Sequence, residues 1–340
     1  MADIIQKHIN EDKFDRSKLK QVILDMPEHI VNALAITGKF KIDAKINAVV
    51  IAGMGGSAMA GEVLKNYLSD VPNLNLRIEV SRNYSLPTWI DENTLIIVSS
   101  YSGNTEETIS AYRDAVKKRC KLLGLTTGGK LKESFTKNNH PQIIIPKGMQ
   151  PRNAICYSFF CMLRVLENSG LIPSQTEYIK ETVKAMKKPM LANAAQELAK
   201  SLVGKIPLIY ASEKFAPVVY RWKCELNENT KIHAFCNVLP ELNHNEIVGF
   251  TKKIGEFHVV VLSEVDDDER TKKRIRITKS LIKQYGVPVT EIGIAGPDKL
   301  TRLFSAILIG DLTSFYLAME YGIDPTPVEI IEKLKDMLEE

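Results

Sequence analysis

The sequence predicts an α/β fold built from two consecutive domains, each a mostly parallel sheet flanked by helices. Short apolar runs alternate with helical patterns over most of the 340 residues, and this alternation pauses once before it starts again. Strands that alternate with helices are typical of a parallel sheet covered on both faces. A chain of this length can bury two separate cores.

The first half begins with an amphipathic helical segment at 1–45 and then supplies five candidate strands. They are expected at Ala48–Ala52, Leu74–Val80, Leu95–Val98, Lys121–Leu125 and Gln142–Ile145. Each run is short and apolar, as expected for strands buried on both faces. Helical patterns lie between them, for example at 58–68 and 105–118, and an apolar helix at 154–170 ends this half.

A more polar helical stretch, Gln175–Leu202, separates this half from a second series of elements. Further strands are expected at Pro207–Tyr210, Lys231–Asn237, Phe257–Leu262 and Pro288–Ile292, with helices at 216–228, 272–285, 299–321 and 327–338. We therefore expect an N-terminal helical segment at 1–45, a first domain at 46–170, a helical connector at 171–200 and a second domain at 201–340.

Composition narrows the functional class. A net charge of +4 is modest and argues against a dedicated nucleic-acid surface, and the basic run Lys272–Lys283 has the apolar spacing of a solvated helix. The five cysteines form no C-x-x-C pair, the first residues lack an apolar leader, and no run approaches 18 apolar residues. These features predict a soluble, reduced, cytoplasmic protein that contacts neither nucleic acid nor membrane.

No metal site is expected. Cys224, His233, Cys236 and His244 are the candidate ligands, but their spacing matches no common zinc site. Buried free cysteines are frequent in protein cores, so these side chains are expected to be structural and the chain to need no metal.

The most informative segment is Leu95–Thr108, L-I-I-V-S-S-Y-S-G-N-T-E-E-T. An apolar strand runs into a loop rich in hydroxyl groups, which includes Ser100, Ser102 and Thr105, and acidic residues typical of a first helical turn follow. Backbone N–H groups at a helix start, with hydroxyl groups beside them, suit an anion. The loop contains no Lys or Arg, so it predicts a phosphate of a small metabolite held by amides and hydroxyls.

A second glycine-rich loop follows the first expected strand. Gly56 and Ser57 place bare backbone and a small hydroxyl group there, where open α/β sheets bind ligands. A rival interpretation is a dinucleotide site, because Gly53, Gly55 and Ala58 fit G-x-G-x-x-A and Glu79 ends the next strand. A plainer alternative is that the glycines only permit tight turns.

Two residues suit acid–base chemistry, and a third suits the stabilisation of negative charge. Glu228 and His244 each lie between two asparagines, whose side chains can fix the orientation of a neighbour. Arg152 precedes a helix and suits an anion or a developing negative charge. The alternatives are a solvated helix end for Glu228, a loop position for His244 and a surface ion pair for Arg152.

Near the C-terminus, the segment D-P-T-P-V resembles a helix start. Asp324 or Thr326 is the expected N-cap, and Pro327 suits the first turn. Lys333 is then expected on roughly the same helix face as Thr326.

Taken together, these motifs resemble a known family. G-G-S, S-S-Y-S-G-N-T-E-E-T, P-R, N-E-N, L-N-H-N-E and D-P-T-P-V occur in this order within residues 45–335. They are similar to the motifs of the bifunctional phosphoglucose/phosphomannose isomerases. The resemblance implies two SIS (sugar isomerase) domains with a flavodoxin-like αβα arrangement.

The resemblance also implies roles. Gly56, Ser57, Ser100, Ser102 and Thr105 match the phosphate-binding loops. Glu228 matches the residue that moves a proton between C2 and C1 through a cis-enediolate, His244 the ring-opening histidine, and Arg152 the arginine that supports the enediolate. Thr326 and Lys333 are the counterparts of a threonine and a lysine that complete the pocket, and the threonine leaves room near C2 for both epimers.

The implied activity is interconversion of glucose 6-phosphate and mannose 6-phosphate with fructose 6-phosphate, without a cofactor, by a homodimer with shared active sites. Three alternatives stay open. They are an isomerase of another sugar phosphate, a non-catalytic SIS protein that senses a sugar phosphate, and an NAD-dependent enzyme that uses Gly53, Gly55 and Glu79.

Overall fold

The computed structural model describes residues 11–339. Backbone contacts divide the chain into two compact units, and each contains one sheet. The unit that we call the N-half unit consists of Asp25–Ala185 and Pro297–Thr301. The C-half unit consists of the described residues up to Leu24, Met186–Gly296 and those from Arg302 onward. The domain boundaries expected from the sequence stay predictions.

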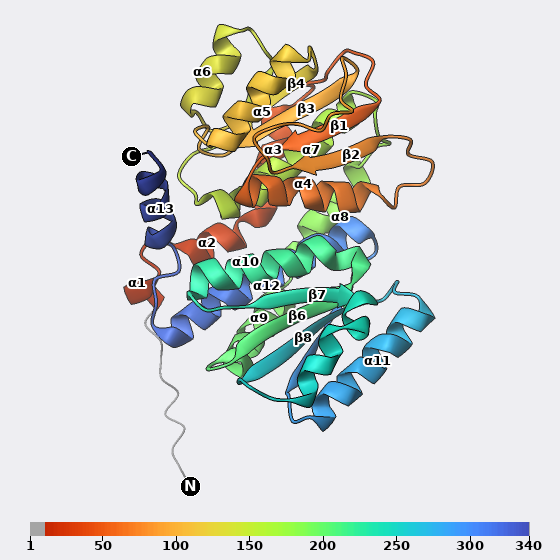
Figure 1. The fold of residues 1–340 in the computed structure, drawn as a ribbon, viewed down its shortest axis with the longest axis vertical. Coiled ribbons are helices and arrows are strands. Elements are labelled where there is room, and N and C mark those ends of the chain that lie inside the picture. Colours follow the sequence, from red (N-terminus) through yellow and green to blue (C-terminus); the bar gives the residue numbers. More distant parts are fainter. Residues whose placement is uncertain (1–10, 340) are drawn as a thin grey trace. The chain divides into compact units, whose positions relative to one another are not determined.

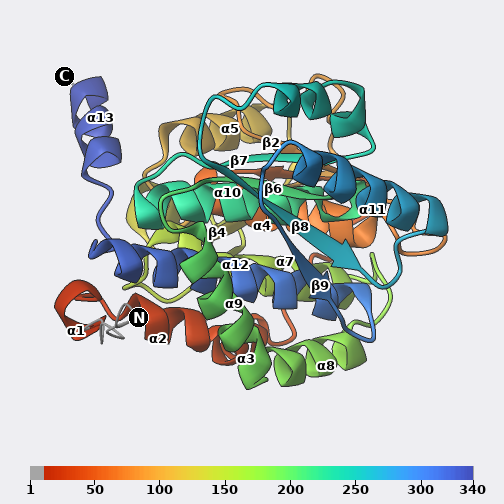
Figure 2. The ribbon, with the colours of Figure 1, turned by 90° about the horizontal axis from the view of Figure 1, so that it is seen from below.

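The N-half unit is a five-stranded parallel sheet in the order β2-β1-β3-β4-β5, with helices on its faces (Figures 1 and 2). The strands are β1 Ala48–Ala52, β2 Arg77–Ser81, β3 Thr94–Ser100, β4 Lys121–Thr126 and β5 Gln142–Ile144. The helices are α3 Met26–Thr37, α4 Gly55–Leu68, α5 Glu106–Lys117, α6 Gly129–Lys137, η1 Pro151–Ala154, α7 Ile155–Asn168 and α8 Thr176–Met186.

Complete burial explains why the sequence signal of this sheet is strong. Every residue of β1 and β3 is buried, and the apolar residues in both strands form a continuous run without alternation. Helix α7 is almost fully buried as well and packs against α3 and α4. The apolar runs of the sequence therefore form the hydrophobic core of this unit.

The C-half unit repeats the arrangement with four parallel strands in the order β7-β6-β8-β9. The strands are β6 Ile206–Ser212, β7 Phe235–Leu239, β8 Phe257–Glu264 and β9 Val289–Ile294. Its helices are α1 Glu11–Phe14, α2 Leu19–Leu24, α9 Pro189–Leu202, η2 Glu213–Phe215, α10 Ala216–Thr230, η3 Glu241–His244, η4 Glu246–Thr251, α11 Glu269–Gln284, α12 Lys299–Tyr321 and α13 Glu329–Glu339. The expected α/β class with two parallel sheets is confirmed. Of the expected N-terminal helical segment, the first ten residues lie outside the described part.

Several predicted elements differ in extent, and two of these differences have a local cause in the backbone. The strand expected at Lys231–Asn237 begins only at Phe235, because Lys231 takes the left-handed conformation (φ 58°, ψ 23°) that ends α10. The stretch Gln175–Leu202 is two helices, because Lys188 is extended and Pro189 starts α9.

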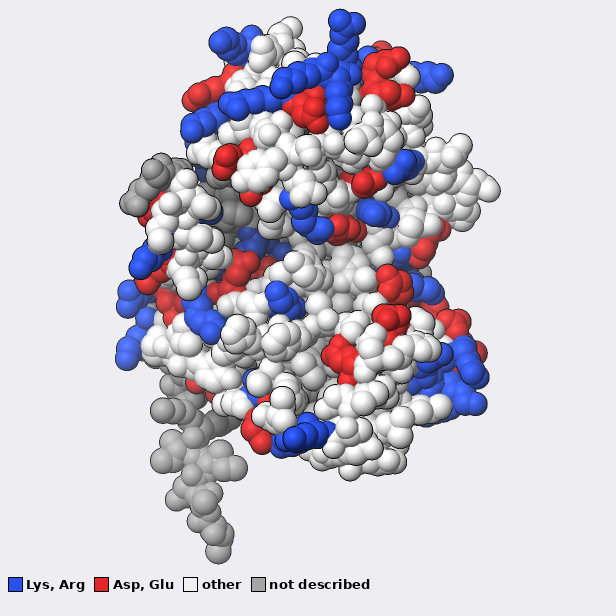
Figure 3. Space-filling view, in the orientation of Figure 1, with Lys and Arg blue, Asp and Glu red and all other residues white. Residues whose placement is uncertain are grey.

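Helix α12 is long and apolar enough to cross a membrane, but 89% of its most apolar window is buried inside the protein. That burial is typical of a core helix. On the face drawn in Figure 3, Lys and Arg side chains mix with Asp and Glu, and basic side chains gather over α11. Ile275 and Ile282 of α11 are buried, so its basic residues form the solvated face of a packed helix, as expected.

Candidate active site

The hydroxyl loop after β3 is folded by its own side chains. Ser100 Oγ lies 2.9 Å from Thr105 Oγ1 and accepts the Gly103 N–H at 3.1 Å. Ser102 Oγ accepts the Asn104 N–H at 3.2 Å. Thr105 is the N-cap of α5, with Glu106 and Glu107 in the first turn. The loop is thus held in a defined shape at a helix start, as the sequence predicts.

The glycines of this region allow backbone to meet backbone. A Cβ atom on Gly103 would lie 1.8 Å from the Gly128 carbonyl oxygen. A Cβ atom on Gly56 would lie 2.7 Å from the Pro151 carbonyl oxygen and 2.9 Å from Cα of Arg152. Close approach, rather than turn formation alone, therefore requires these glycines.

The start of α4 brings four predicted residues of the N-half unit together. The contact at Gly56 places the backbone of Arg152 beside the first turn of α4. In the next position, Ser57 Oγ accepts the Tyr101 N–H at 3.3 Å, which joins this turn to the hydroxyl loop beside Ser100. Arg152 is only 4% exposed, so the alternative of a surface ion pair is wrong.

Both loops follow neighbouring strands at the carboxyl edge of the sheet. Chain order reverses between β1 and β3, and in open α/β sheets ligands bind at such a switch point. Amides at two helix starts and several hydroxyl groups meet there. This arrangement suits a dianionic phosphate whose oxygens each need more than one donor.

In the C-half unit, Glu228 lies in the last turn of α10, and side chains on both sides of it are fixed. Asn227 Nδ2 donates to the Ile232 carbonyl at 2.8 Å. Asn229 Nδ2 donates to Ser314 Oγ at 2.8 Å and to Glu225 Oε2 at 3.2 Å. The asparagines therefore orient this turn, and Glu228 is half-buried.

A buried ion cluster supports the same helix. Arg221 donates to Asp311 of α12 through Nε at 3.0 Å and through Nη2 at 2.6 Å. Its Nη2 also lies 3.1 Å from Glu225 Oε1, and all three side chains are at most 2% exposed. Charges removed from water need such partners, so α10 is held to α12 in one register.

The segment around Thr326 differs from its predicted form. Helix α13 begins at Glu329, and Asp324 Oδ1 accepts the Thr326 N–H at 3.0 Å within the preceding turn. The expected N-cap role for Asp324 or Thr326 is therefore wrong, as is a shared helix face for Thr326 and Lys333. Lys333 is exposed on α13.

Thr326 does come near Glu228, through a residue that the sequence did not single out. The ammonium group of Lys231 donates to the Glu228 carbonyl and to the carbonyls of Pro325 and Pro327. The signal in the sequence is faint: a lysine, rather than a glycine, stands directly after the last turn of α10.

His244 lies elsewhere in the same unit. Strand β7 runs from the loop after α10 to the loop that carries η3, and His244 is the last residue of η3. A five-residue strand spans about 13–17 Å. Within the C-half unit, Glu228 and exposed His244 thus lie at opposite ends of β7.

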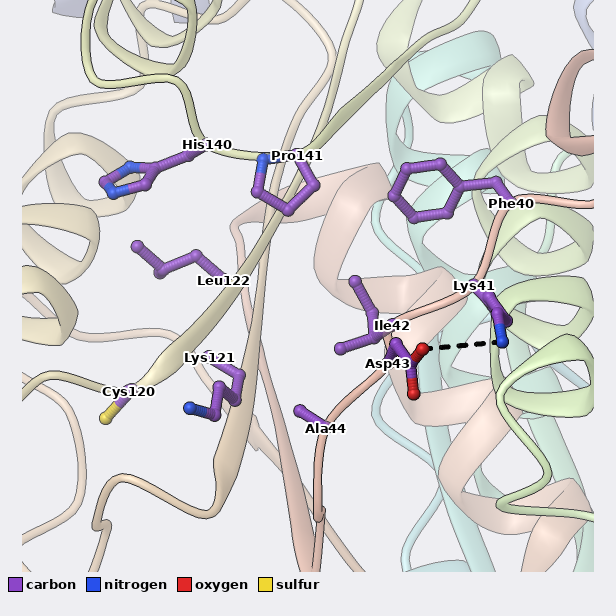
Figure 4. Close-up of a pocket in the computed structure, with 10 residues that line it drawn as sticks. All are labelled: Phe40, Lys41, Ile42, Asp43, Ala44, Cys120, Lys121, Leu122, His140 and Pro141. Atoms are coloured by element: carbon purple, nitrogen blue, oxygen red, sulfur yellow. Dashed lines mark ion pairs between the residues drawn. The ribbon is translucent and has the colours of Figure 1, made fainter.

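A pocket of about 390 Å³ lies at the other edge of the first sheet (Figure 4). It is lined by Phe40–Ala44, Cys120–Leu122, His140 and Pro141, and contains none of the predicted site residues. Lys41 forms an ion pair with Asp43 at 3.6 Å on its rim.

The candidate metal ligands of the sequence do not gather into one group in the structure. Within residues 11–339, no group of three or more His, Cys, Asp or Glu side chains could hold a metal ion. Burial raises the pKa of Cys236 to about 11 and also raises the pKa of Cys224. The absence of a metal stays a prediction.

The sequence is similar to a family model and to several proteins of known name. Residues 191–338 match the bacterial phospho-glucose isomerase C-terminal SIS domain. The chain is 42% identical to the bifunctional phosphoglucose/phosphomannose isomerase of Caldicellulosiruptor bescii, an alignment that covers 94% of this chain and 98% of the relative.

Two further similarities are to a relative named for a different reaction and to a solved structure. The D-glucosamine-6-phosphate 4-epimerase of Sulfolobus acidocaldarius is 32% identical over 84% of this chain and 87% of the relative. Among solved structures, a hypothetical protein from Thermus thermophilus superposes with a TM-score of 0.76 at 14% identity, covering 95% and 90% of the two chains. At that identity the structural likeness shows the fold alone.

Proposed function

Because the chain belongs to the family of bifunctional phosphoglucose/phosphomannose isomerases, we propose that it interconverts glucose 6-phosphate and mannose 6-phosphate with fructose 6-phosphate. The observation that carries the proposal is the pair of hydroxyl- and amide-lined loops at the β1/β3 switch point. These loops supply hydrogen-bond donors suited to phosphate. In this proposal, other side chains contact the sugar carbons that react.

In the proposed site, Gly56, Ser57, Ser100, Ser102 and Thr105 hold the phosphate. Binding there supplies energy remote from the reacting carbons, which positions C1 and C2. Sugars without phosphate should therefore be poor substrates.

The proposed chemistry is proton transfer. His244 assists opening of the pyranose ring. The Glu228 carboxylate takes the C2 proton of the aldose, and the resulting cis-enediolate receives a proton at C1 to give the ketose. The Arg152 guanidinium stabilises the negative oxygen of the enediolate. Thr326 and Lys333 complete the pocket near the reacting carbons. No electrons leave the sugar, so the reaction needs no redox cofactor, and we propose that it proceeds without a metal.

The separation of Glu228 and His244 along β7 favours a homodimer in which each site takes one of them from each subunit. Mixing inactive Glu228→Gln and His244→Ala chains tests this. A shared site predicts recovered activity in verified heterodimers, and complete absence of recovery would reject it. We further propose that the enzyme is cytoplasmic and that it acts on small sugar phosphates without binding nucleic acid or a membrane.

The activity is tested by turnover of fructose 6-phosphate in EDTA, with glucose 6-phosphate and mannose 6-phosphate measured separately. The proposal predicts both products and a loss of at least about a hundredfold in kcat for Glu228→Gln. Glucose 6-phosphate alone would remove the dual specificity assigned to Thr326. Binding of fructose 6-phosphate without turnover would favour a sensor.

A second candidate rests on the S. acidocaldarius relative, whose name places its reaction at C4 of glucosamine 6-phosphate. Incubation with glucosamine 6-phosphate, followed by NMR of the ring protons, distinguishes the two. An altered configuration at C4 would support the epimerase, whereas an unchanged substrate would exclude it.

A further inference from the structure

We infer that Lys231 is a positioning residue that fixes the Thr326 segment against the end of α10, and thereby sets the place of Thr326 relative to Glu228. The inference deepens the proposed function and rests on it for its catalytic consequence. Its structural part stands on contacts within the C-half unit alone.

The contacts of the Lys231 ammonium group carry the argument. Nζ donates to the carbonyls of Pro325 at 3.1 Å and Pro327 at 2.6 Å, one on each side of Thr326. It donates also to the carbonyl of Glu228 at 2.5 Å. An ammonium group has three N–H donors, which can satisfy all three of these acceptors at once.

The choice of acceptors makes the link specific. The Glu228 carbonyl is among the last of α10, where carbonyls lack a helical partner and attract a cation. Pro325 and Pro327 have no N–H, so each contributes only a carbonyl to backbone hydrogen bonding. Thr326 is the residue of this segment that has both an N–H and a carbonyl. Thr326 N–H is already bonded to Asp324 Oδ1. One side chain thus joins the Glu228 turn to both neighbours of Thr326.

The backbone of Lys231 is adapted to this reach. It is left-handed, at φ 58° and ψ 23°, a conformation that is unfavourable for a residue with a Cβ atom. Glycine is the usual residue here. A lysine in this position closes the helix and turns its side chain back over the last turn of α10.

The rest of the turn is held independently. Asn227 bonds the Ile232 carbonyl, and Asn229 bonds Ser314 and Glu225. Removing the Lys231 side chain should therefore release the 325–327 segment while α10 keeps its place. This separates a positioning role from general loss of structure.

The test compares Lys231→Asn with Lys231→Arg. Asparagine accepts the left-handed conformation but is too short to reach the prolines, whereas arginine keeps both charge and reach. Lys205→Asn is the control, because Lys205 is half-buried and pairs with exposed Glu256 at the amino end of β6 in the same unit.

Hydrogen exchange of the 322–330 segment is the first readout. The inference predicts faster exchange at Asp324, Thr326 and Val328 in Lys231→Asn, with exchange of α10 unchanged and protection restored in Lys231→Arg. Unchanged exchange in Lys231→Asn would overturn it. Hydrogen exchange does not depend on turnover. If the wild-type protein were inactive on fructose 6-phosphate, the proposed function would be rejected, but the exchange data would still test the link between Lys231 and the 325–327 segment.

Kinetics are the second readout. For Lys231→Asn the inference predicts kcat lower by roughly tenfold or more with little change in KM, because phosphate is held by other residues. It also predicts an altered ratio of glucose 6-phosphate to mannose 6-phosphate, and partial recovery in Lys231→Arg. Unchanged kcat and product ratio would overturn it. If Lys231→Asn fails to fold, Lys231→Arg decides, since near-normal kinetics would support the inference and kinetics as poor as those of an unfolded chain would contradict it.

Discussion

At the scale of single residues, the loops of the N-half unit depend on contacts that join distant parts of the chain. The sequence identified Gly56 and Ser57 as a ligand loop, but the reason for Gly56 is the backbone of Pro151 and Arg152, almost a hundred positions away. Periodicity and motif spacing carry no information on such a contact. For the same reason the sequence could not distinguish a buried Arg152 from a surface one.

The substitution Gly56→Ala should therefore be costly. Its methyl group would meet backbone atoms at 2.7 and 2.9 Å, which cannot move aside as a flexible side chain can. We expect a loss of about 1–3 kcal/mol in the free energy of unfolding, measured with urea. Gly293→Ala is the control, since a Cβ atom there meets nothing within 4 Å, and an equal effect of both substitutions would contradict the explanation.

At the scale of elements, buried strands were predictable and helix ends were not. The runs that form β1, β3 and β8 are apolar because both faces are covered, so the sequence alone located them. The start of β7 was misplaced because Lys231 takes the left-handed conformation that ends α10, and the start of α13 because a turn with the bond from Thr326 N–H to Asp324 Oδ1 precedes that helix. Periodicity in the sequence shows neither feature.

The packing of α10 on α12 gives a prediction at this scale. Asp311→Asn removes a carboxylate that accepts two bonds from buried Arg221, and should lower the free energy of unfolding by on the order of 3 kcal/mol. The exposed pair Lys200–Glu197 is the contrast, and Glu197→Gln should cost less than about 1 kcal/mol. Chemical denaturation of both variants measures the difference, and similar values would show that burial does not matter here.

At the scale of the whole molecule, the two units share one strand order, in which the first strand of each sheet lies between the second and the third. From alternation alone, the sequence predicted two consecutive α/β units with parallel sheets, but it did not predict their strand order. It could not predict that Glu228 and His244 lie at opposite ends of β7, because that follows from where a crossover helix ends relative to its sheet. The separation is what favours a site completed by a second subunit.

Buried and half-buried histidines make stability depend on pH. His29, His140 and His258 each have a pKa below the usual 6.5, chiefly because burial disfavours the charged imidazole. Below pH 6.5 the unfolded chain binds more protons than the folded one, so stability is complete above that pH and is lost as pH falls. We expect Tm to fall between pH 7.5 and pH 5, and His140→Gln to reduce the slope. The same substitution at exposed His233 should leave the slope unchanged.

The most direct test of the proposed mechanism is conversion of fructose 6-phosphate in D₂O, followed by NMR of the separated products. Proton transfer through an enediolate by Glu228 predicts glucose 6-phosphate and mannose 6-phosphate that both carry deuterium at C2, and neither product with Glu228→Gln. Formation of both products by Glu228→Gln at the wild-type rate would contradict the role of Glu228. Absence of both products with the wild-type protein would contradict the proposed activity itself.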